Sequence, residues 1–267
     1  MPSSLRSKNL INRRRNRRLA KAIFLLITLV AFIFAPSLLS KNSYLQIKSV
    51  EIKGNQLISK NEIMSVTLGE LSGDYLSLYS KANIFLYPKN KIKSEISSRF
   101  PRIKEVETEL KDQNNLIITV SEREPSALWC EKGEEECFLL DEEGFIFDKS
   151  PGFSPQVYLT FRGESRGDDP IGEFVLSKER FTNVSEFLKG MERLNLSPRE
   201  LLLEGEDVVV SVSEGAEILF NSTDDVYSTL SNLESVLNDQ KLQLRSGDEL
   251  NVSRIDLRFG NKVFYRE

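Results

Sequence analysis

One uncharged segment near the N-terminus constrains this chain more than any other feature. Residues 22–39 read AIFLLITLVAFIFAPSLL and contain no charged side chain. At a rise of ~1.5 Å per residue, this segment would form a helix about 27 Å long, close to the ~30 Å thickness of a bilayer's hydrocarbon core. We therefore predict a transmembrane helix over residues 22–40.

Two other interpretations of this segment stay open. The sequence Ala35-Pro36-Ser37 resembles the small-residue cleavage site of a signal peptide, although the apolar run exceeds the usual ~7–15 residues. A buried core helix is the other alternative, against which the length of the uncharged run argues. Cleavage or anchoring would leave the remaining chain on the same side of the membrane.

The charges that flank the segment predict its orientation. Residues 1–21 carry eight Lys and Arg side chains and no acid. Because Lys and Arg near the end of a span favour the cytoplasmic side, we predict a single-pass type II protein of the inner (cytoplasmic) membrane. Residues 1–21 would be a basic cytoplasmic tail, and the bulk of the chain would lie outside the cytoplasm.

The charge of the remaining chain excludes some partners. The whole chain has 36 Lys and Arg and 40 Asp and Glu, so removing the eight N-terminal cations leaves 28 against 40, a net charge of −12. This acidity argues against nucleic acid as a partner. The chain also contains no histidine, which excludes Ser-His-Asp and Cys-His catalysis and His-ligated zinc.

The two cysteines lie close together in the sequence. Cys130 and Cys137 flank a short loop that suits a hairpin, and an extracytoplasmic location permits a disulfide. Opposed residues of an antiparallel ladder come within disulfide reach. The residues alone do not decide between a disulfide and two free thiols in a half-buried hairpin.

The region after the span predicts a compact α+β module over residues 45–122. Alternating residues at 45–53 indicate a strand, and a helix begins at Ser59, which can cap it. A second helix begins at Pro88 and ends before Pro101. Strands follow near 105–111 and 116–120, so the predicted order is β-α-α-β-β, with both helices on one face of the sheet.

A second domain is predicted over residues 125–267, because Pro125 should end the preceding strand. It is expected to be a mixed β-sheet carrying two helices. The expected elements are a hairpin around the cysteines, an acidic turn at 141–144 into a strand at 145–147, a loop at about 149–173, a helix from Ser177, strands at 200–204, 207–213 and 216–221, a helix at about 223–239, and a closing strand at 254–265 that turns or bulges at Gly260-Asn261.

No group of residues indicates an active site. The acidic clusters at 134–136 and 141–143 are consecutive, so their side chains would point in different directions, unlike a convergent carboxylate pair. A membrane-anchored wall hydrolase would need such a pair, with Asp141 or Glu142 essential. We therefore predict no catalytic, metal or cofactor-binding residues and no small-molecule substrate. An unpaired strand edge, which can accept a partner's strand, is the expected functional feature.

Four segments of the sequence match a known family. They are VEIKGN at 50–55, SEREPSA at 121–127, FLLDEEGFIF at 138–147 and IDLRFGNKVFYR at 255–266. Together with a basic tail, one span and an α+β module, they make the chain resemble the bacterial cell-division family FtsQ/DivIB, whose first extracytoplasmic module is a POTRA domain. The resemblance covers residues 13–267.

The resemblance implies a non-enzymatic divisome scaffold at the division septum. Members of this family bind the single-span proteins FtsB/DivIC and FtsL and so help control septal peptidoglycan synthesis. In the family, a C-terminal strand binds FtsB by strand addition, and the matching partner-binding positions here are Phe259, Asn261 and Tyr265. The alternative for Phe259 and Tyr265 is that they only pack on the sheet.

A different function class also fits a POTRA module. A POTRA-bearing secretion or outer-membrane assembly factor would bind unfolded or exported chains through the strand near 103–111. Outer-membrane assembly proteins of this kind continue into a membrane barrel, and we expect none after the two domains predicted here.

Overall fold

The computed structural model describes residues 4–152, 158–164, 167, 169–239, 245–246 and 249–266, and the side chains of residues 1–15 lie outside this description. The chain forms two compact units. The first contains Met1–Arg99 and Glu105–Glu122, and the second contains Phe100–Lys104 and Arg123–Glu267.

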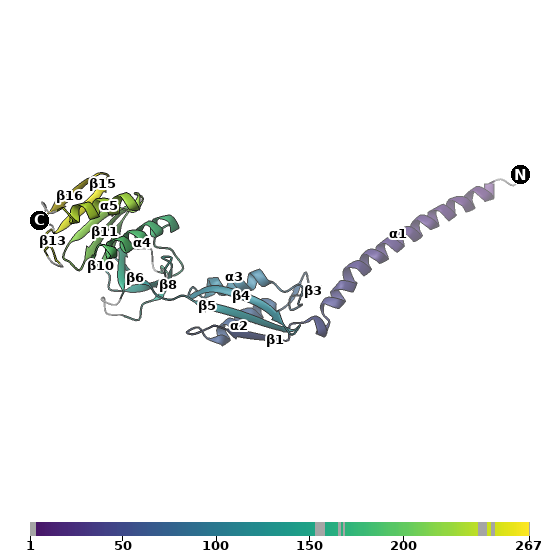
Figure 1. The fold of residues 1–267 in the computed structure, drawn as a ribbon. Coiled ribbons are helices and arrows are strands. Elements are labelled where there is room, and N and C mark those ends of the chain that lie inside the picture. Colours follow the sequence, from purple (N-terminus) through teal and green to yellow (C-terminus); the bar gives the residue numbers. More distant parts are fainter. Residues whose placement is uncertain are drawn as a thin grey trace. The chain divides into compact units, whose positions relative to one another are not determined.

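The first unit consists of a long helix, a three-stranded sheet with two helices, and a small hairpin (Figure 1). Its elements are α1 (Ser4–Ser40), a 3-10 turn (Ser43–Leu45), β1 (Ser49–Lys53), α2 (Lys60–Leu71), β2 (Asp74–Tyr75), β3 (Tyr79–Ser80), α3 (Lys89–Arg99), β4 (Ile103–Lys111) and β5 (Asn115–Glu122).

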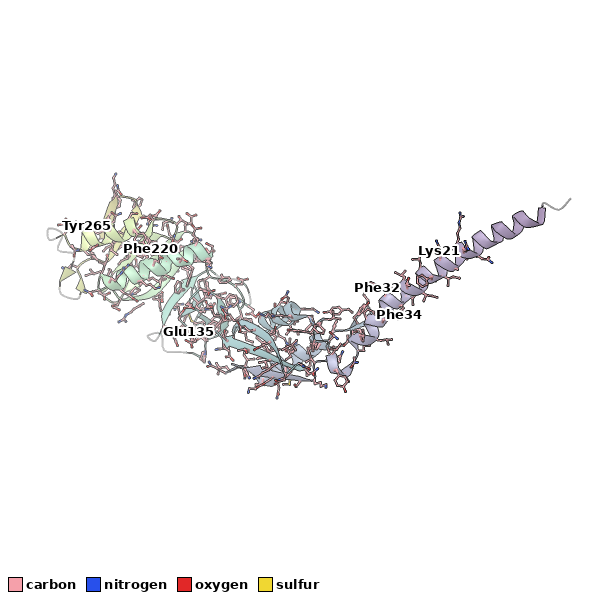
Figure 2. The ribbon with its side chains drawn as sticks, turned by 45° about the vertical axis from the view of Figure 1, so that its right-hand side comes forward. Lys21, Phe32, Phe34, Glu135, Phe220 and Tyr265 are labelled. Atoms are coloured by element: carbon pink, nitrogen blue, oxygen red, sulfur yellow. A yellow bond between two sulfur atoms is a disulfide. The ribbon has the colours of Figure 1, made fainter. Side chains whose placement is uncertain are left out.

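Helix α1 extends well beyond the apolar run predicted for it. It continues through the basic tail on one side and includes Pro36 within its last turns. Its segment Asn16–Ser40 is long and apolar enough to cross a membrane. Phe32 and Phe34 project from this part of the helix (Figure 2), and most of its large apolar side chains are exposed. This exposure indicates that the described chain itself does not cover the helix.

The three-stranded sheet has the order β1-β5-β4, and β1 is parallel to β5. The predicted β-α-α-β-β order is confirmed, as is the cap at Ser59, whose hydroxyl accepts from the amide of Asn61. Buried isoleucines Ile63 of α2 and Ile92 of α3 help to form its core. The predicted start of the first strand at residue 45 is wrong, because a 3-10 turn capped by Asn42 occupies that position.

The second unit contains a nine-stranded sheet, a small two-stranded sheet and two helices. Its elements are β6 (Ala127–Glu131), β7 (Cys137–Leu140), β8 (Ile146–Lys149), β9 (Leu159–Gly163), α4 (Lys178–Arg193), β10 (Pro198–Glu204), β11 (Asp207–Val212), β12 (Glu217–Asn221), α5 (Val226–Leu237), β13 (Arg245–Ser246), β14 (Glu249–Leu250), β15 (Arg254–Phe259) and β16 (Lys262–Arg266).

The large sheet has the strand order β16-β15-β12-β11-β10-β9-β6-β7-β8 and contains both parallel and antiparallel pairs. This confirms the predicted α+β class and the mixed sheet with two helices. The loop predicted at 149–173 is partly wrong, because β9 lies within it, between β6 and β10. Surrounding Gly, Pro and charged residues hid this five-residue strand, although Thr160 and Phe161 favour a sheet.

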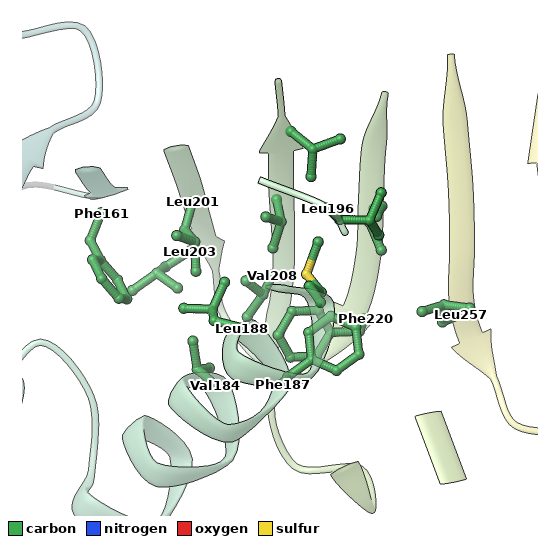
Figure 3. Close-up of a cluster of buried hydrophobic side chains, with 14 of the residues drawn as sticks. Phe161, Val184, Phe187, Leu188, Leu196, Leu201, Leu203, Val208, Phe220 and Leu257 are labelled. Carbon is green, nitrogen blue, oxygen red and sulfur yellow. The ribbon is translucent and has the colours of Figure 1, made fainter. Parts of the chain in front are cut away.

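The main core lies between this sheet and helices α4 and α5. Figure 3 shows the part of this core around Val184, Phe187 and Leu188 of α4. The apolar stripe predicted on α4 is buried, and Phe187 stacks on Phe220 of β12 with ring centroids 4.0 Å apart. Trp129 of β6 also belongs to this core. A smaller cluster, which includes Cys130 and Phe147, forms separately in the β6-β7-β8 region.

The two cysteines are neighbours in the β6-β7 hairpin. Cys130 pairs with Cys137 in the antiparallel register, their Cα atoms are 4.3 Å apart, and the structure joins them in a disulfide. Because the bond closes a loop with a sequence separation of 7, it restricts the unfolded chain as well as the hairpin.

We expect the disulfide to stabilise the second unit by about 2 kcal/mol, the value that loop closure gives for such a short loop. The measurement is urea unfolding of the full chain, followed by the fluorescence of Trp129 with and without a reductant. A Cys130→Ala, Cys137→Ala double variant should not respond to the reductant. Thiols that react in the unfolded, unreduced chain would contradict the bond.

Candidate functional site

The two edges of the large sheet differ in whether their outward-facing backbone groups are hydrogen-bonded to another segment of the chain. At the β8 edge, the amide of Ile146 donates to the carbonyl of Glu173 and its carbonyl accepts from Gly172, each at 2.8 Å. An isolated antiparallel β-bridge between Phe145 and Phe174 adds to the contacts of residues 172–174 with this edge. In the sheet as described, β16 forms the opposite edge and pairs with β15 alone. Strand β16 is therefore the open edge.

The hairpin of β15 and β16 carries all three predicted partner-binding residues. Phe259 ends β15, and Asn261 lies in the turn. Tyr265, which is labelled in Figure 2, lies on β16. Gly260 begins this turn with a φ of 63°, a conformation that favours glycine. The carbonyl of Gly260 accepts from Asn232 of α5 at 2.8 Å, which ties the turn to the neighbouring helix.

A bulge decides which face of the hairpin each aromatic side chain occupies. The pairing shifts between Asp256 and Phe259, so that Phe259 pairs with Lys262 and lies on the same face as Phe264. The rings of Phe259 and Phe264 meet edge to face, with centroids 5.1 Å apart. Both rings nevertheless stay exposed, at 55% and 54%. They form an apolar patch beside the open edge.

Tyr265 lies on the other face of the hairpin. It pairs with Ile255, which is fully buried in the core, and its neighbour Val263 also packs against that core. Tyr265 is 43% exposed. The structure therefore brings Phe259 together with Phe264, which the sequence analysis did not single out, and separates both from Tyr265.

Arg258 lies beside the aromatic patch and is bound by two carboxylates. Arg258 donates through Nε to Asp256 at 2.8 Å and through Nη1 to Asp207 of β11 at 2.5 Å, and its guanidinium lies 5.9 Å from the ring centroid of Phe259. The hydrogen bonds from Arg258 lower the pKa of the Asp256 carboxyl. The hydrogen bonds that Arg258 donates to Asp256 and Asp207 raise the pKa of Arg258. The alternating sequence IDLR was the only signal for this cluster.

The acidic turn after β7 has a structural use. Asp141 is almost fully buried, and its Oδ1 accepts from the amides of Glu143 at 2.8 Å and Phe145 at 3.0 Å. Its Oδ2 pairs with Arg123, and Glu142 pairs with Lys104 at 2.8 Å. Glu143 shares Lys104 with Glu142, at 3.4 Å, so the carboxylates of this turn are paired with basic side chains. Among the described residues, no group of three or more His, Cys, Asp or Glu side chains could hold a metal ion.

We expect the second unit to lose the stabilisation of the Asp256–Arg258 pair in acid, when Asp256 is protonated. Because the folded pKa of Asp256 lies below the ordinary 3.8, its contribution is complete above that pH and is lost as the pH falls through the folded pKa. Asp256→Asn should therefore show a smaller loss of unfolding free energy than the parent chain between about pH 5 and pH 2. Urea unfolding at several pH values measures this, and an unchanged pH dependence would contradict it.

Comparisons with known proteins find similarity that extends over both units. Residues 45–123 match the family model for the FtsQ-type POTRA domain. The cell division protein DivIB of Clostridium botulinum (strain Loch Maree / Type A3) is 26% identical over 267 residues, which covers 96% of this chain and 94% of that protein. DivIB of Clostridium tetani is 22% identical over 221 residues, covering 80% of this chain and 78% of that protein. The chain thus contains an FtsQ-type POTRA domain and is similar over most of its length to cell division proteins named DivIB, which supports the FtsQ/DivIB family.

Proposed function

We propose that the chain is a non-catalytic scaffold of the bacterial divisome that binds FtsB/DivIC-like and FtsL-like single-span proteins outside the membrane. In this role it helps control septal peptidoglycan synthesis. The observation that carries the proposal is the open β16 edge with its exposed aromatic pair, in a chain of the FtsQ/DivIB family.

The proposed arrangement in the membrane rests on the N-terminal region. The basic residues of 1–21 would stay in the cytoplasm, residues 22–40 would span the membrane, and the POTRA domain at 45–122 and the β domain at 125–267 would lie outside. An extracytoplasmic position also suits the disulfide between Cys130 and Cys137.

Strand addition is the binding mode that the edge favours. An added strand would pair with the backbone of β16, and side chains on both faces would set its specificity. Lys262 and Arg266 lie at the two ends of β16 and are exposed, so the edge is basic as well as apolar. We propose that the partner strand carries acidic side chains near its ends and apolar ones between them.

Because the aromatic residues lie on opposite faces, single substitutions can tell which face the partner covers. We expect Phe259→Asp to weaken binding of an FtsB-like coiled-coil protein at least about tenfold, since exposed aromatic anchors often contribute most of the binding energy. Tyr265→Asp should weaken it as well if the partner wraps over the edge. The measurement is binding of the full-length chain, in detergent, to the purified partner.

Tyr227→Asp is the matched control, because Tyr227 is an exposed aromatic residue of the same unit but lies in the first turn of α5. It should leave binding unchanged. Binding that survives both substitutions in the hairpin would contradict the proposed edge. Absence of any binding, with preference for unfolded exported chains through β4, would instead favour a secretion or assembly factor.

A further inference from the structure

A small hairpin of the first unit is bound to the end of helix α1. Strands β2 and β3 form this hairpin, and β3 lies beside the helix (Figure 1). The hydroxyl of Ser37 donates to the carbonyl of Leu78 at 2.7 Å, and the hydroxyl of Tyr79 donates to the carbonyl of Ile33 at 3.1 Å. The hairpin therefore contacts the last two turns of the apolar helix.

Ser40 makes this contact a specific one. It is 5% exposed, and its hydroxyl accepts from the amide of Ser80 at 3.3 Å. Its carbonyl accepts from the side-chain amides of Gln46 and Asn83. Asn83 is buried, and its own carbonyl accepts from Leu86 and Tyr87. The same polar side chains thus fix the end of α1 and the loop that follows β3.

The length of the apolar run determines where this contact lies in a membrane. Residues 22–33 alone would make a helix of about 18 Å, well short of the ~30 Å hydrocarbon core. The turns up to residue 39 are needed to cross it. Because Tyr79 binds the carbonyl of Ile33, the hairpin must reach the lipid headgroups whenever α1 spans the bilayer.

The side chains around this contact are unusually apolar for an exposed surface. We define the membrane-proximal surface as the side chains of Tyr44, Tyr75, Leu76, Phe85 and Leu86. Leu76 is 87% exposed, and Tyr44 and Phe85 are each 78% exposed. Backbone hydrogen bonds between residues 45–47 and 82–84 hold the segments of this surface together.

The turn at Leu76 holds two residues other than glycine in the left-handed backbone region. Leu76 and Ser77 have φ angles of 51° and 60°, and the amide of Leu78 donates to the carbonyl of Tyr75, as in a type I′ turn. Asn and Gly normally occupy these positions. A leucine in this conformation costs free energy, and its exposed side chain lies at the tip of the hairpin, where it can enter an apolar medium.

Cations accompany the aromatic residues of the surface. Lys48 lies 5.9 Å from the ring centroid of Tyr44, and Lys81 lies 5.9 Å from that of Tyr75. Tyrosine rings at the headgroup level and lysines that reach anionic phosphates are typical of a membrane interface. The charge of this surface is therefore complementary to anionic phospholipid.

We propose that the membrane-proximal surface binds the extracytoplasmic leaflet of the bilayer, with Leu76 and Phe85 among the acyl chains and Lys48 and Lys81 at anionic headgroups. This inference rests on the membrane anchor of the proposed function. The POTRA domain is then held at the membrane by two elements, helix α1 and the hairpin that is bound to it.

The test uses the full-length chain in phosphatidylcholine–phosphatidylglycerol vesicles that contain brominated acyl chains, which quench tryptophan on contact. Phe85→Trp places a reporter in the surface. Leu57→Trp is the control, because Leu57 is 74% exposed in the same unit but lies beyond the end of β1, near Glu122. Phe24→Trp reports on the span itself. The parent chain supplies the background of buried Trp129.

We expect Phe85→Trp and Phe24→Trp to lose at least about half of their added emission and Leu57→Trp to keep nearly all of it. Quenching of Phe24→Trp but not of Phe85→Trp would overturn the lipid-binding surface and leave the anchor intact. Absence of quenching at Phe24→Trp would overturn the anchor and this inference together. Emission of Phe85→Trp that follows protein concentration rather than lipid would overturn the inference in favour of contact between two copies.

A second variant separates insertion from simple proximity. In the Phe85→Trp background, Leu76→Asn should reduce the quenching at least about twofold, because asparagine tolerates the left-handed turn but does not enter lipid. A Leu57→Asn substitution in the same background should change nothing. Equal quenching with and without Leu76 would contradict the insertion of this turn.

Discussion

Backbone amide and carbonyl groups that leave water need hydrogen-bond partners, and this requirement explains the main features of the chain. It makes the membrane segment a helix, whose internal bonds satisfy nearly every group. Pro36 removes one donor from α1 near the point where the hydroxyl of Tyr79 binds the helix backbone. In the second unit, residues 172–175 meet the same requirement at one edge of the sheet, whereas β16 ends the described sheet at the other edge.

The sequence predicted the strongly periodic parts of this architecture well. Helix α4 has a broad apolar stripe and a serine cap, and both are evident in the sequence. The β-α-α-β-β order followed from Ser59, Pro88 and Pro101, which mark helix ends by their backbone chemistry. Strand β9 was missed because five residues in a parallel pair give little periodic signal when the flanking sequence is typical of a loop.

The candidate site was only partly predictable. The alternating sequence after Arg254 indicated a strand pair, but not the bulge that turns Phe259 onto the face of Phe264. A shift of one residue reverses the face of every later side chain, so faces cannot be assigned from alternation alone. The contact of Arg258 with Asp207 joins residues 51 positions apart and depends on the order of strands in the sheet.

The polar contacts at Ser40 have a practical consequence for soluble fragments. A fragment that begins after this residue would lack the carbonyl of Ser40, to which the side chains of Gln46 and Asn83 donate hydrogen bonds. It would also lack the hydroxyl of Ser40, which accepts a hydrogen bond from the amide of Ser80. Three buried or half-buried groups would then have to find water, and the loop that presents Phe85 would lose its support. Truncation at the membrane boundary therefore alters the folded domain itself, and keeping the last helical turn of α1 is the way to preserve it.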